Sequence, residues 1–282
     1  MGSAIAERLL DGGYSVYVHN RTREKAQPLL DRGAAWSENP LETCDRVIIS
    51  LYTTGVVESV LDKLSRWLRP GKTLLDTTTG DPQRMTSLGE SLARRGVAYL
   101  ECPISGSSEQ TRRHMSTALA AGPPEVFAAC EDLLECIAAK SFYVGEWGDG
   151  VRMKLVTNLV LGLNRAVLAE GLSFSRAIGL SMSRALEVLL NSPAYSRTMD
   201  AKGPKMVSGE FTPQAKLSQH IKDVQLILDE ASRGNKYLPL TQQHLALLAQ
   251  AEADGLGELD NSAIFNAIDG AQSPRYQDKP LS

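Results

Sequence analysis

The sequence contains few of the residues that mark specialised classes of protein. Only four of its 282 residues are cysteine and four are histidine, and aromatic residues make up 6%. Cys44, Cys102, Cys130 and Cys136 form neither the C-x-x-C spacing of a zinc or redox site nor the density of a secreted disulfide scaffold. We therefore expect reduced thiols, no metal site and no disulfide framework.

An excess of charge of one sign is also absent. The chain has 30 Lys+Arg against 33 Asp+Glu, a net charge of −3, which gives it as a whole no attraction to nucleic acid or to an anionic membrane. No run approaches the roughly 18 apolar residues of a membrane-spanning helix, and no basic segment precedes an apolar stretch at the start. We expect a cytoplasmic protein whose partners include neither nucleic acid nor membrane.

What the sequence does contain is an ordinary globular composition, with 43% hydrophobic residues, 23 glycines and 13 prolines. At roughly 150 residues per domain, its length predicts two domains or one large one. Up to about Gly145, short runs rich in Val, Ile and Tyr alternate with amphipathic stretches, which indicates an α/β fold with a doubly wound, parallel sheet. The strand candidates are Tyr14 to His19, Arg46 to Leu51, Thr73 to Thr77, Ala98 to Cys102, Thr117 to Ala121 and Phe142 to Val144. The helix candidates between them are Ser3 to Leu10, Arg23 to Leu30, Val56 to Leu68, Pro82 to Arg95 and Pro124 to Ile137.

After Gly150 the pattern becomes entirely helical. One long helix is predicted over Val151 to Ile178, with a broad buried face. Shorter helices are predicted at Ser183 to Leu190, Gln214 to Ser232, Thr241 to Ala253 and Ser262 to Ile268. We therefore predict a dinucleotide-binding domain over residues 1–147, an all-helical dimerisation and catalytic domain over 148–270, and a flexible tail over 271–282.

The first element has an unusual position. A doubly wound dinucleotide-binding domain starts with a strand and a Gly-rich turn that leads into a helix, whereas this chain starts with the helix. Met1 and Gly2 fit the end of a G-x-G-x-x-G turn, so the domain lacks its first strand; a flexible N-terminus is the alternative. Since that strand would lie at the centre of the sheet, we expect unpaired strand edges and poor folding of the chain as given.

The residues after the next strand point to the cofactor. Asn20, Arg21 and Thr22 follow it, 18 residues after Gly2, where a dinucleotide-binding domain reads the ribose. A carboxylate there would repel the 2′-phosphate of NADP, whereas a guanidinium can pair with it. Arg21 therefore favours NADP over NAD, with NAD possible; a solvated arginine at a helix start is the alternative reading.

The junction of the two halves carries the candidate chemistry. Lys154 and Asn158 are spaced i, i+4, so they share one face of the predicted helix. A lysine in the first turns of a helix is unfavourable for the helix dipole, and the dipole and burial would both lower its pKa toward the range of a general acid or base. An ordinary surface lysine is the alternative.

Two polar segments follow strands at the edge where open sheets bind ligands. Ser105, Gly106 and Ser107 offer hydroxyls and backbone N–H groups to a carboxylate, unless they form a plain turn. Thr78 and Thr79 end the strand before, and offer hydroxyls toward a cofactor.

Together these segments resemble the β-hydroxyacid dehydrogenases, which include 3-hydroxyisobutyrate dehydrogenase, tartronate semialdehyde reductase and glyoxylate/succinic semialdehyde reductase. The resemblance covers nearly the whole chain, and seven family patterns occur in order. They are G-x-G-x-M-G, cut at Met1-Gly2; N-R-T at Asn20-Arg21-Thr22; D-x-S-T at Asp76-Thr77-Thr78-Thr79; P-V-S-G-G at Pro103-Ile104-Ser105-Gly106-Ser107; G-x-G-x-x-x-K-x-x-N-N at Gly148 to Asn158; K-D-L at Lys222-Asp223-Val224; and D-x-S-A at Asp260-Asn261-Ser262-Ala263.

The resemblance implies an NADP-dependent enzyme, assembled as a homodimer or homotetramer, that interconverts a small β-hydroxyacid and its semialdehyde or keto acid. Lys154 would be the catalytic acid/base, and Asn158 with the loop Ser105, Gly106 and Ser107 would bind the substrate carboxylate. The cofactor would be bound by Met1, Gly2, Asn20, Arg21, Thr22, Leu51, Thr78, Thr79 and Lys222.

The sequence departs from the family patterns at three positions. Ser107 replaces the second loop glycine, His114 stands where glycine is frequent, and Thr157 replaces the first asparagine of the N-N pair. These departures bear on the substrate more than on the reaction type. Two alternatives stand beside the dehydrogenase. One is a non-catalytic relative acting as an oligomeric interaction module; the other is an imine reductase, which Lys154 disfavours because those sister enzymes usually carry another residue type there.

Overall fold

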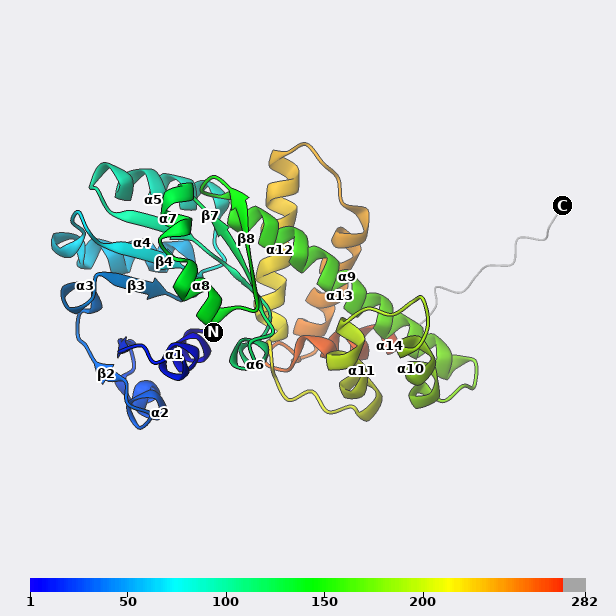
Figure 1. Ribbon diagram of the computed structural model, residues 1–282. Coiled ribbons are helices and arrows are strands. Elements are labelled where there is room, and N and C mark those ends of the chain that lie inside the picture. The colour runs from blue at the N-terminus through cyan, green and yellow to red at the C-terminus, as the bar shows by residue number, and fades with distance from the viewer. Residues whose placement is uncertain (271–282) are drawn as a thin grey trace. The chain divides into compact units, whose positions relative to one another are not determined.

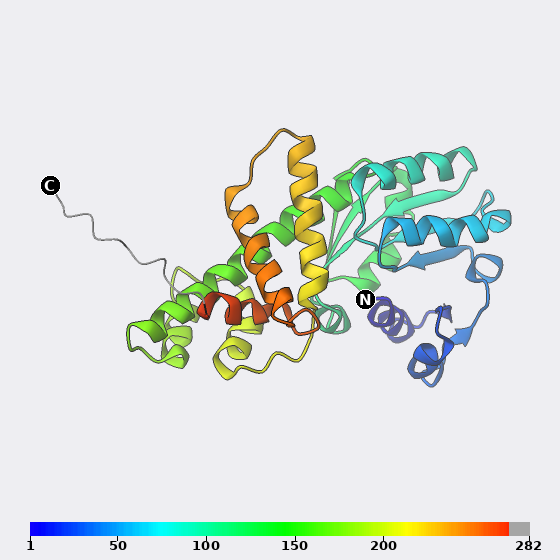
Figure 2. The same ribbon diagram turned by 180° about the vertical axis from the view of Figure 1, so that it is seen from behind.

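The computed structural model describes residues 1–270 and divides into two compact units, Met1–Thr157 and the chain from Asn158 onward (Figures 1 and 2). Each unit has its own hydrophobic core. The division falls inside the long helix α9 (Asp149–Ala177), ten residues after the predicted boundary at 147. The tail predicted over 271–282 lies outside the described residues.

The first unit alternates short strands with helices, as the hydrophobic pattern predicts. Its strands are β1 (Tyr17–Val18), β2 (Ala35–Trp36), β3 (Arg46–Ile49), β4 (Thr73–Asp76), β5 (Ala98–Glu101), β6 (Ile104–Ser105), β7 (Thr117–Ala121) and β8 (Lys140–Gly145). Its α-helices are α1 (Gly2–Asp11), α2 (Gln27–Leu30), α3 (Pro40–Thr43), α4 (Thr54–Lys63), α5 (Pro82–Arg94), α6 (Ser108–Arg112), α7 (Pro124–Ala128) and α8 (Glu131–Ile137), with 3-10 turns at η1 (Arg23–Ala26) and η2 (Ser65–Trp67). The two-residue strands β2 and β6 are too short to show a period of two in the sequence.

The main sheet has the order β3-β4-β5-β7-β6, and β8 pairs with β7. Strands β3, β4 and β5 are parallel, as predicted, and β8 is parallel to β7, but β7 is antiparallel to β5. The reason is the connection. Only the five-residue helix α6 lies between β6 and β7, and a helix of about 7 Å cannot carry the chain back along a strand of about 17 Å.

Strands β1 and β2 form a separate, two-stranded parallel sheet. Among the described residues, β1 pairs only with β2 and β3 pairs only with β4, so each has an edge that no strand covers. Helix α1 connects the two sheets by packing: Ile5 and Leu9 belong to the core of the main sheet, and Ala6 packs with Val18 and Leu29 beside the small sheet.

The second unit contains only helices among the described residues. They are the remainder of α9, α10 (Met182–Leu190), α11 (Thr198–Ser208), α12 (Leu217–Arg233), α13 (Pro239–Ala253), the 3-10 turn η3 (Asn261–Ala263) and α14 (Ile264–Asp269). Helix α11 has no counterpart in the predictions, because it contains Pro204, a residue that normally ends a helix.

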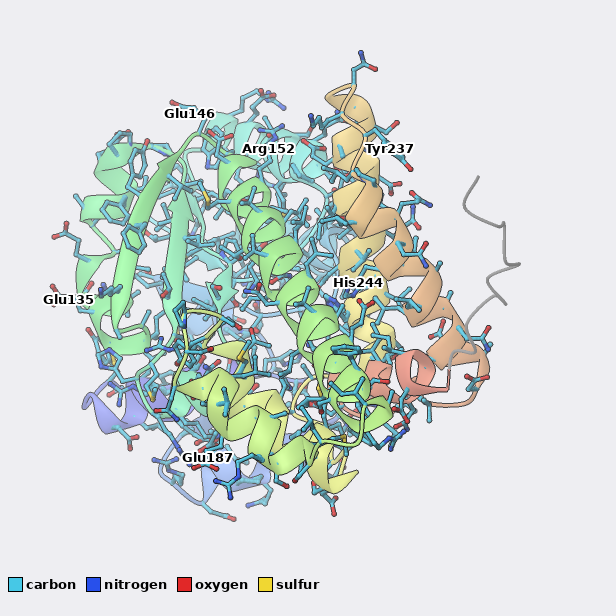
Figure 3. All side chains as sticks on the ribbon, turned by 90° about the vertical axis from the view of Figure 1, so that its right-hand side faces the viewer. Glu135, Glu146, Arg152, Glu187, Tyr237 and His244 are labelled. Atoms are coloured by element: carbon cyan, nitrogen blue, oxygen red, sulfur yellow. The ribbon has the colours of Figure 1, made fainter. Side chains whose placement is uncertain are left out.

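Buried polar groups tie the helices of this unit together. The carboxylate of Asp260 accepts hydrogen bonds from Lys202 Nζ at 2.8 Å and from the backbone N–H of Gln214 at 2.9 Å, and these bonds lower the pKa of Asp260. The Nε2 atom of His220 on α12 lies 3.2 Å from the Nε2 atom of His244 on α13. Figure 3 labels His244. Burial lowers the pKa of both rings, that of His244 to about 4.

Helix α9 is, by length and composition, apolar enough to cross a membrane. Its most apolar 18 residues have a mean hydropathy of 1.2, and 39% of that window is buried within the protein. Polar residues such as Asn158 and Arg165 interrupt the apolar run of this helix, so the criterion of an unbroken run does not detect it. The helix also buries the polar side chains of Asn158 and Arg165.

The uncovered edges of β1 and β3 generate a prediction about stability. An apolar strand fused ahead of Met1 should pair with both edges and join the two sheets, because unpaired backbone groups in a sheet interior are costly. We expect the extended chain to melt at least about 5 °C higher than the 282-residue chain in thermal unfolding followed by circular dichroism. An extension of equal length carrying two prolines is the control, and equal melting temperatures for all three chains would contradict the prediction.

Candidate active site

The candidate site is built at the carboxyl ends of three parallel strands. Ile49 of β3, Asp76 of β4 and Glu101 of β5 are register partners, so the loops that follow them start side by side. The loop after β3 is joined to the loop after β4, because the backbone N–H of Leu51 donates to Thr78 Oγ1 at 3.2 Å. Two predicted cofactor residues from different loops are therefore in contact.

Asp76 fixes the second of these loops. It is fully buried, and it accepts hydrogen bonds from the Thr78 backbone N–H at 2.9 Å and from the Tyr99 hydroxyl at 3.1 Å. Burial raises the pKa of Asp76 to about 6, and the two hydrogen bonds act in the opposite direction. Thr78 is hydrogen-bonded to Asp76 through its backbone N–H and to Leu51 through its hydroxyl. These two bonds fix the backbone of the loop at the point where Thr79 follows.

Helix α1 begins at Gly2, beside the loop after β3. A Cβ on Gly2 would lie 3.4 Å from Ser50 Cβ, so the helix start and this loop are close. No side chain caps the N-terminus of α1. The first N–H groups of a helix have no partner within the helix and carry the positive end of its dipole, which is the arrangement that binds a phosphate.

The predicted ribose-binding residues follow β1. Asn20 Nδ2 donates to the Thr22 carbonyl at 2.7 Å, which closes the turn around Arg21. The ring of His19 packs against Trp36 of β2, with centroids 5.3 Å apart. Arg21 is exposed and has no ion-pair partner among the described residues. Its guanidinium is therefore available to a phosphate.

The predicted substrate loop leads from β6 into α6. Gly106, at φ +148°, lies between Ser105 and Ser107 in a backbone conformation that other residues rarely adopt. Ser107 caps α6: its Oγ accepts from the Gln110 N–H at 3.1 Å, and its own N–H donates to Gln110 Oε1 at 2.8 Å. Because that N–H is already engaged, the Ser107 group that remains for a carboxylate is the hydroxyl hydrogen.

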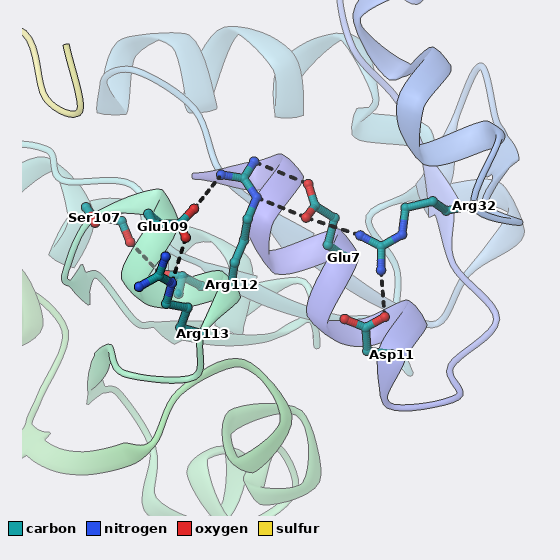
Figure 4. A network of polar contacts seen from close by, with 8 residues as sticks. Glu7, Asp11, Arg32, Ser107, Glu109, Arg112 and Arg113 are labelled. Atoms are coloured by element: carbon teal, nitrogen blue, oxygen red, sulfur yellow. Dashed lines mark hydrogen bonds and ion pairs between the residues drawn. The ribbon is translucent and has the colours of Figure 1, made fainter. Parts of the chain in front are cut away.

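A network of polar contacts joins this loop to helix α1 (Figure 4). Arg112 of α6 donates to both carboxylate oxygens of Glu7, at 2.9 and 3.2 Å. Arg32, after α2, contacts the same Glu7 at 3.2 Å and Asp11 at 2.6 Å. The Thr111 hydroxyl also lies 3.4 Å from Met1 Sδ. The structure therefore brings the predicted cofactor helix and the predicted substrate loop together.

The other two departures from the family patterns have local explanations. His114 has φ +53°, a left-handed conformation that glycine adopts without strain, and its Nε2 bonds to the Glu135 carbonyl at 2.9 Å. Thr157 Oγ1 donates to the Lys154 carbonyl at 2.8 Å, within α9. Neither change removes a side chain that the predicted chemistry requires.

Lys154 and Asn158 lie one turn apart on α9, and both are buried, with 7% and 9% of their surface exposed. In the second unit, Asn158 Nδ2 donates to Asp223 Oδ2 of α12 at 3.1 Å. Lys222, which precedes Asp223 on α12, is half-buried, and burial lowers its pKa. Within the second unit, Asn158 of α9 is thus hydrogen-bonded to the K-D-V motif of α12.

Sequence reasoning missed three acidic residues, two in the first unit and one in the second. Asp223 and Asp76 stand in quoted motifs but were given no role. Glu101 was not singled out, although it is fully buried and burial raises its pKa to about 7. Asp76 and Glu101 could have been found from the sequence, because each is an acidic residue at the end of an apolar strand. A buried carboxylate at such a position needs a specific hydrogen-bond partner.

These features define a class: a dinucleotide-binding α/β unit followed by an all-helical unit that shares one long helix with it. Residues 1–145 match the family described as the NAD binding domain of 6-phosphogluconate dehydrogenase, and residues 148–268 match NAD-binding of NADP-dependent 3-hydroxyisobutyrate dehydrogenase. The chain is 30% identical over 274 residues to glyoxylate/succinic semialdehyde reductase 1 of Arabidopsis thaliana, which covers 95% of each protein. It belongs to the β-hydroxyacid dehydrogenase family.

Two further similarities bear on function. The chain is 30% identical over 273 residues to the cytokine-like nuclear factor N-PAC of Xenopus tropicalis, and this match covers 95% of the chain but only 51% of the relative, so the chain spans about half the length of that protein. The solved structure of Psf3 in complex with NADP+ and 2-OPP has a TM-score of 0.84 and 28% identity, covering 95% of this chain and 96% of that one.

The free guanidinium of Arg21 generates a prediction about the cofactor. We expect tighter binding of NADPH than of NADH, and Arg21→Ala should reduce this preference by about 10- to 100-fold, the usual value of a charge-assisted pair. The measurement is a fluorescence titration of each cofactor. Arg23→Ala, which removes an arginine that stacks on Trp36, is the matched control. Equal affinities of the parent chain for the two cofactors would refute the prediction.

Proposed function

We propose that this chain is an NADP(H)-dependent oxidoreductase that interconverts a small β-hydroxyacid and its semialdehyde or keto acid. Membership of the family supports the reaction class, and the similarity to a glyoxylate/succinic semialdehyde reductase supports a short carboxylate as substrate. The observation that carries the proposal is the buried Lys154 in the first two turns of α9, one turn before Asn158.

The cofactor part of the proposal rests on groups that fit a dinucleotide. The uncapped N-terminus of α1 would bind the pyrophosphate, and Asn20, Arg21 and Thr22 would hold the 2′-phosphate end. Leu51, Thr78, Thr79 and Lys222 complete the predicted set. When bound, NADPH supplies a hydride to the carbonyl carbon of the substrate; NAD(H) is a weaker alternative cofactor.

Lys154 handles the proton of the reaction in this proposal. During reduction its ammonium donates a proton to the carbonyl oxygen, and during oxidation its amine recovers that proton from the hydroxyl. Asn158, oriented by Asp223, holds the substrate through its amide. The hydroxyls of Ser105 and Ser107 bind the substrate carboxylate, with Gly106 allowing close approach.

A second candidate function is a non-catalytic interaction module. The observation that favours it is the similarity to N-PAC, which bears the name of a nuclear factor and matches at the same identity as the reductase. The buried pair Lys154 and Asn158 favours the enzyme, because burying a lysine costs free energy that a purely structural module has no reason to retain.

We also propose that the chain forms a homodimer, alone or within a tetramer. Met153, Val160, Val167 and Phe174 recur every seven residues along α9 and are 41%, 50%, 65% and 63% exposed. Such a stripe fits a second helix of the same kind. The four free cysteines support a cytoplasmic location, because reduced thiols persist in that compartment.

The exposed stripe can be tested directly. Val167→Glu should convert the assembled protein to monomers in size-exclusion chromatography with light scattering, because it places a carboxylate inside the apolar contact. Val188→Glu is the control, since Val188 is 60% exposed on α10, outside the stripe. A parent chain that is monomeric at micromolar concentration, or a V167E variant that stays assembled, would contradict the proposed interface.

The central test of the proposed function is Lys154→Ala. We expect the variant to bind NADPH as the parent does but to lose at least about 100-fold in turnover of glyoxylate or succinic semialdehyde, the usual effect of removing a general acid. Lys140→Ala, which removes an exposed lysine of β8, should be unchanged. If neither aldehyde is reduced by the parent, or if K154A keeps parental turnover, the proposed function is wrong.

A further inference from the structure

A buried side chain of the sheet is hydrogen-bonded to the start of helix α9. Glu101, the last residue of β5, has no exposed surface. Its Oε2 accepts a hydrogen bond from the backbone N–H of Gly148 at 2.5 Å, and its Oε1 accepts one from the backbone N–H of Val151. These two N–H groups lie just before and inside the first turn of α9, while Glu101 is 47 and 50 residues away in sequence.

This attachment satisfies groups that the helix itself cannot. The first N–H groups of a helix have no acceptor within the helix, and a carboxylate also interacts favourably with the positive end of the helix dipole. The fit is close: a Cβ on Gly150 would lie 2.9 Å from both Glu101 Oε1 and the Leu119 carbonyl oxygen. The first turn of α9 is therefore held directly against β5 and β7.

Lys154 follows Val151 by three residues and so lies almost directly above it on the helix. Its side chain is 7% exposed, which restricts the space that its amine can occupy. A change in the height or rotation of the first turn would therefore move the amine of Lys154. No other side-chain carboxylate in the described residues accepts from the N–H groups of both Gly148 and Val151.

We propose that Glu101 is the positioning residue for Lys154: its carboxylate fixes the first turn of α9 and thereby the location of the lysine amine. The proposal rests on the proposed role of Lys154 as the proton donor and acceptor. Glu101 itself does not contact the reacting atoms in this account. It acts through the two backbone hydrogen bonds, which require two acceptor oxygens at the length of a glutamate side chain.

Glu101→Gln tests this requirement. Glutamine has the same length, but it offers one acceptor oxygen and an NH2 group that would face a backbone N–H donor. Glu146→Gln is the matched control. Glu146 is exposed, precedes α9 by three residues and undergoes the same change of a carboxyl group to an amide; Figure 3 labels it.

The first measurement is amide hydrogen exchange of the segment 148–155 in the full chain. We expect exchange at least about tenfold faster in E101Q than in the parent, and no change in E146Q. The second measurement is the pH dependence of acetylation of Lys154 by acetic anhydride, followed by mass spectrometry. We expect a shifted profile for Lys154 in E101Q only, because its amine has moved; Lys140 serves as the internal reference.

The outcomes separate the two proposals. Parental exchange in E101Q, or faster exchange with an unchanged Lys154 profile, would overturn the positioning role whatever the activity of the chain. Where glyoxylate or succinic semialdehyde is turned over, E101Q should lower kcat about tenfold at an unchanged KM. Normal turnover in K154A would instead overturn the proposed role of Lys154 in proton transfer. The exchange measurement would then still test whether Glu101 fixes the first turn of α9.

If E101Q does not fold, Glu101→Asp gives a second route. Aspartate keeps two acceptor oxygens, but its shorter side chain places them farther from the N–H groups of Gly148 and Val151. Both hydrogen bonds should therefore be weakened and not lost, so amide exchange over 148–155 should be faster than in the parent but slower than in a chain without these bonds. It should also shift the Lys154 acetylation profile in the same direction as E101Q. An E101D variant identical to the parent in both measurements would contradict the proposal.

Discussion

Strands β3, β4 and β5 end at one level, and the remaining parts of the candidate site depend on that register. The pairing of Ile49, Asp76 and Glu101 places three loops at the same edge of the sheet. Two of those strand ends are acidic and buried, which is costly unless the carboxylates have partners. Asp76 accepts a hydrogen bond from the backbone N–H of Thr78 in the loop that follows it, and Glu101 accepts one from the backbone N–H of Gly148 at the start of α9. The cost of burial is thus offset by bonds that shape the site.

Much of the fold follows from the pattern of apolar residues. Short apolar runs such as Arg46 to Leu51 predict the strands β3, β4 and β5. The spacing of apolar residues over Val151 to Ile178 predicts the long helix α9. The direction of β7 could not be read, because strand polarity depends on the length of the connection and not on the strand itself. Helix α11 was missed for a different reason: packing in the second unit overrides the helix-breaking preference of Pro204.

The site was predictable where a single local motif defines it. Lys154 and Asn158 follow from i, i+4 spacing, and Arg21 from its distance to Gly2. Glu101 and Asp223 could not be found in this way, because their partners are 47 and 65 residues distant in sequence. Ser107 is an intermediate case. The spacing of Ser107 and Gln110 is a readable capping signature. From the sequence, however, Ser107 was assigned only to a loop that offers hydroxyls and N–H groups to a carboxylate, or to a plain turn.

The most direct test of the account follows a labelled hydride. Incubation of the full chain with glyoxylate or succinic semialdehyde and NADPH deuterated at the transferable position should give a hydroxyacid with one deuterium on the carbinol carbon, detected by mass spectrometry. That result would establish both the cofactor and the reaction class. Oxidation of NADPH without deuterium in the product, or no product from either aldehyde, would contradict the assignment of this chain as a hydride-transferring reductase.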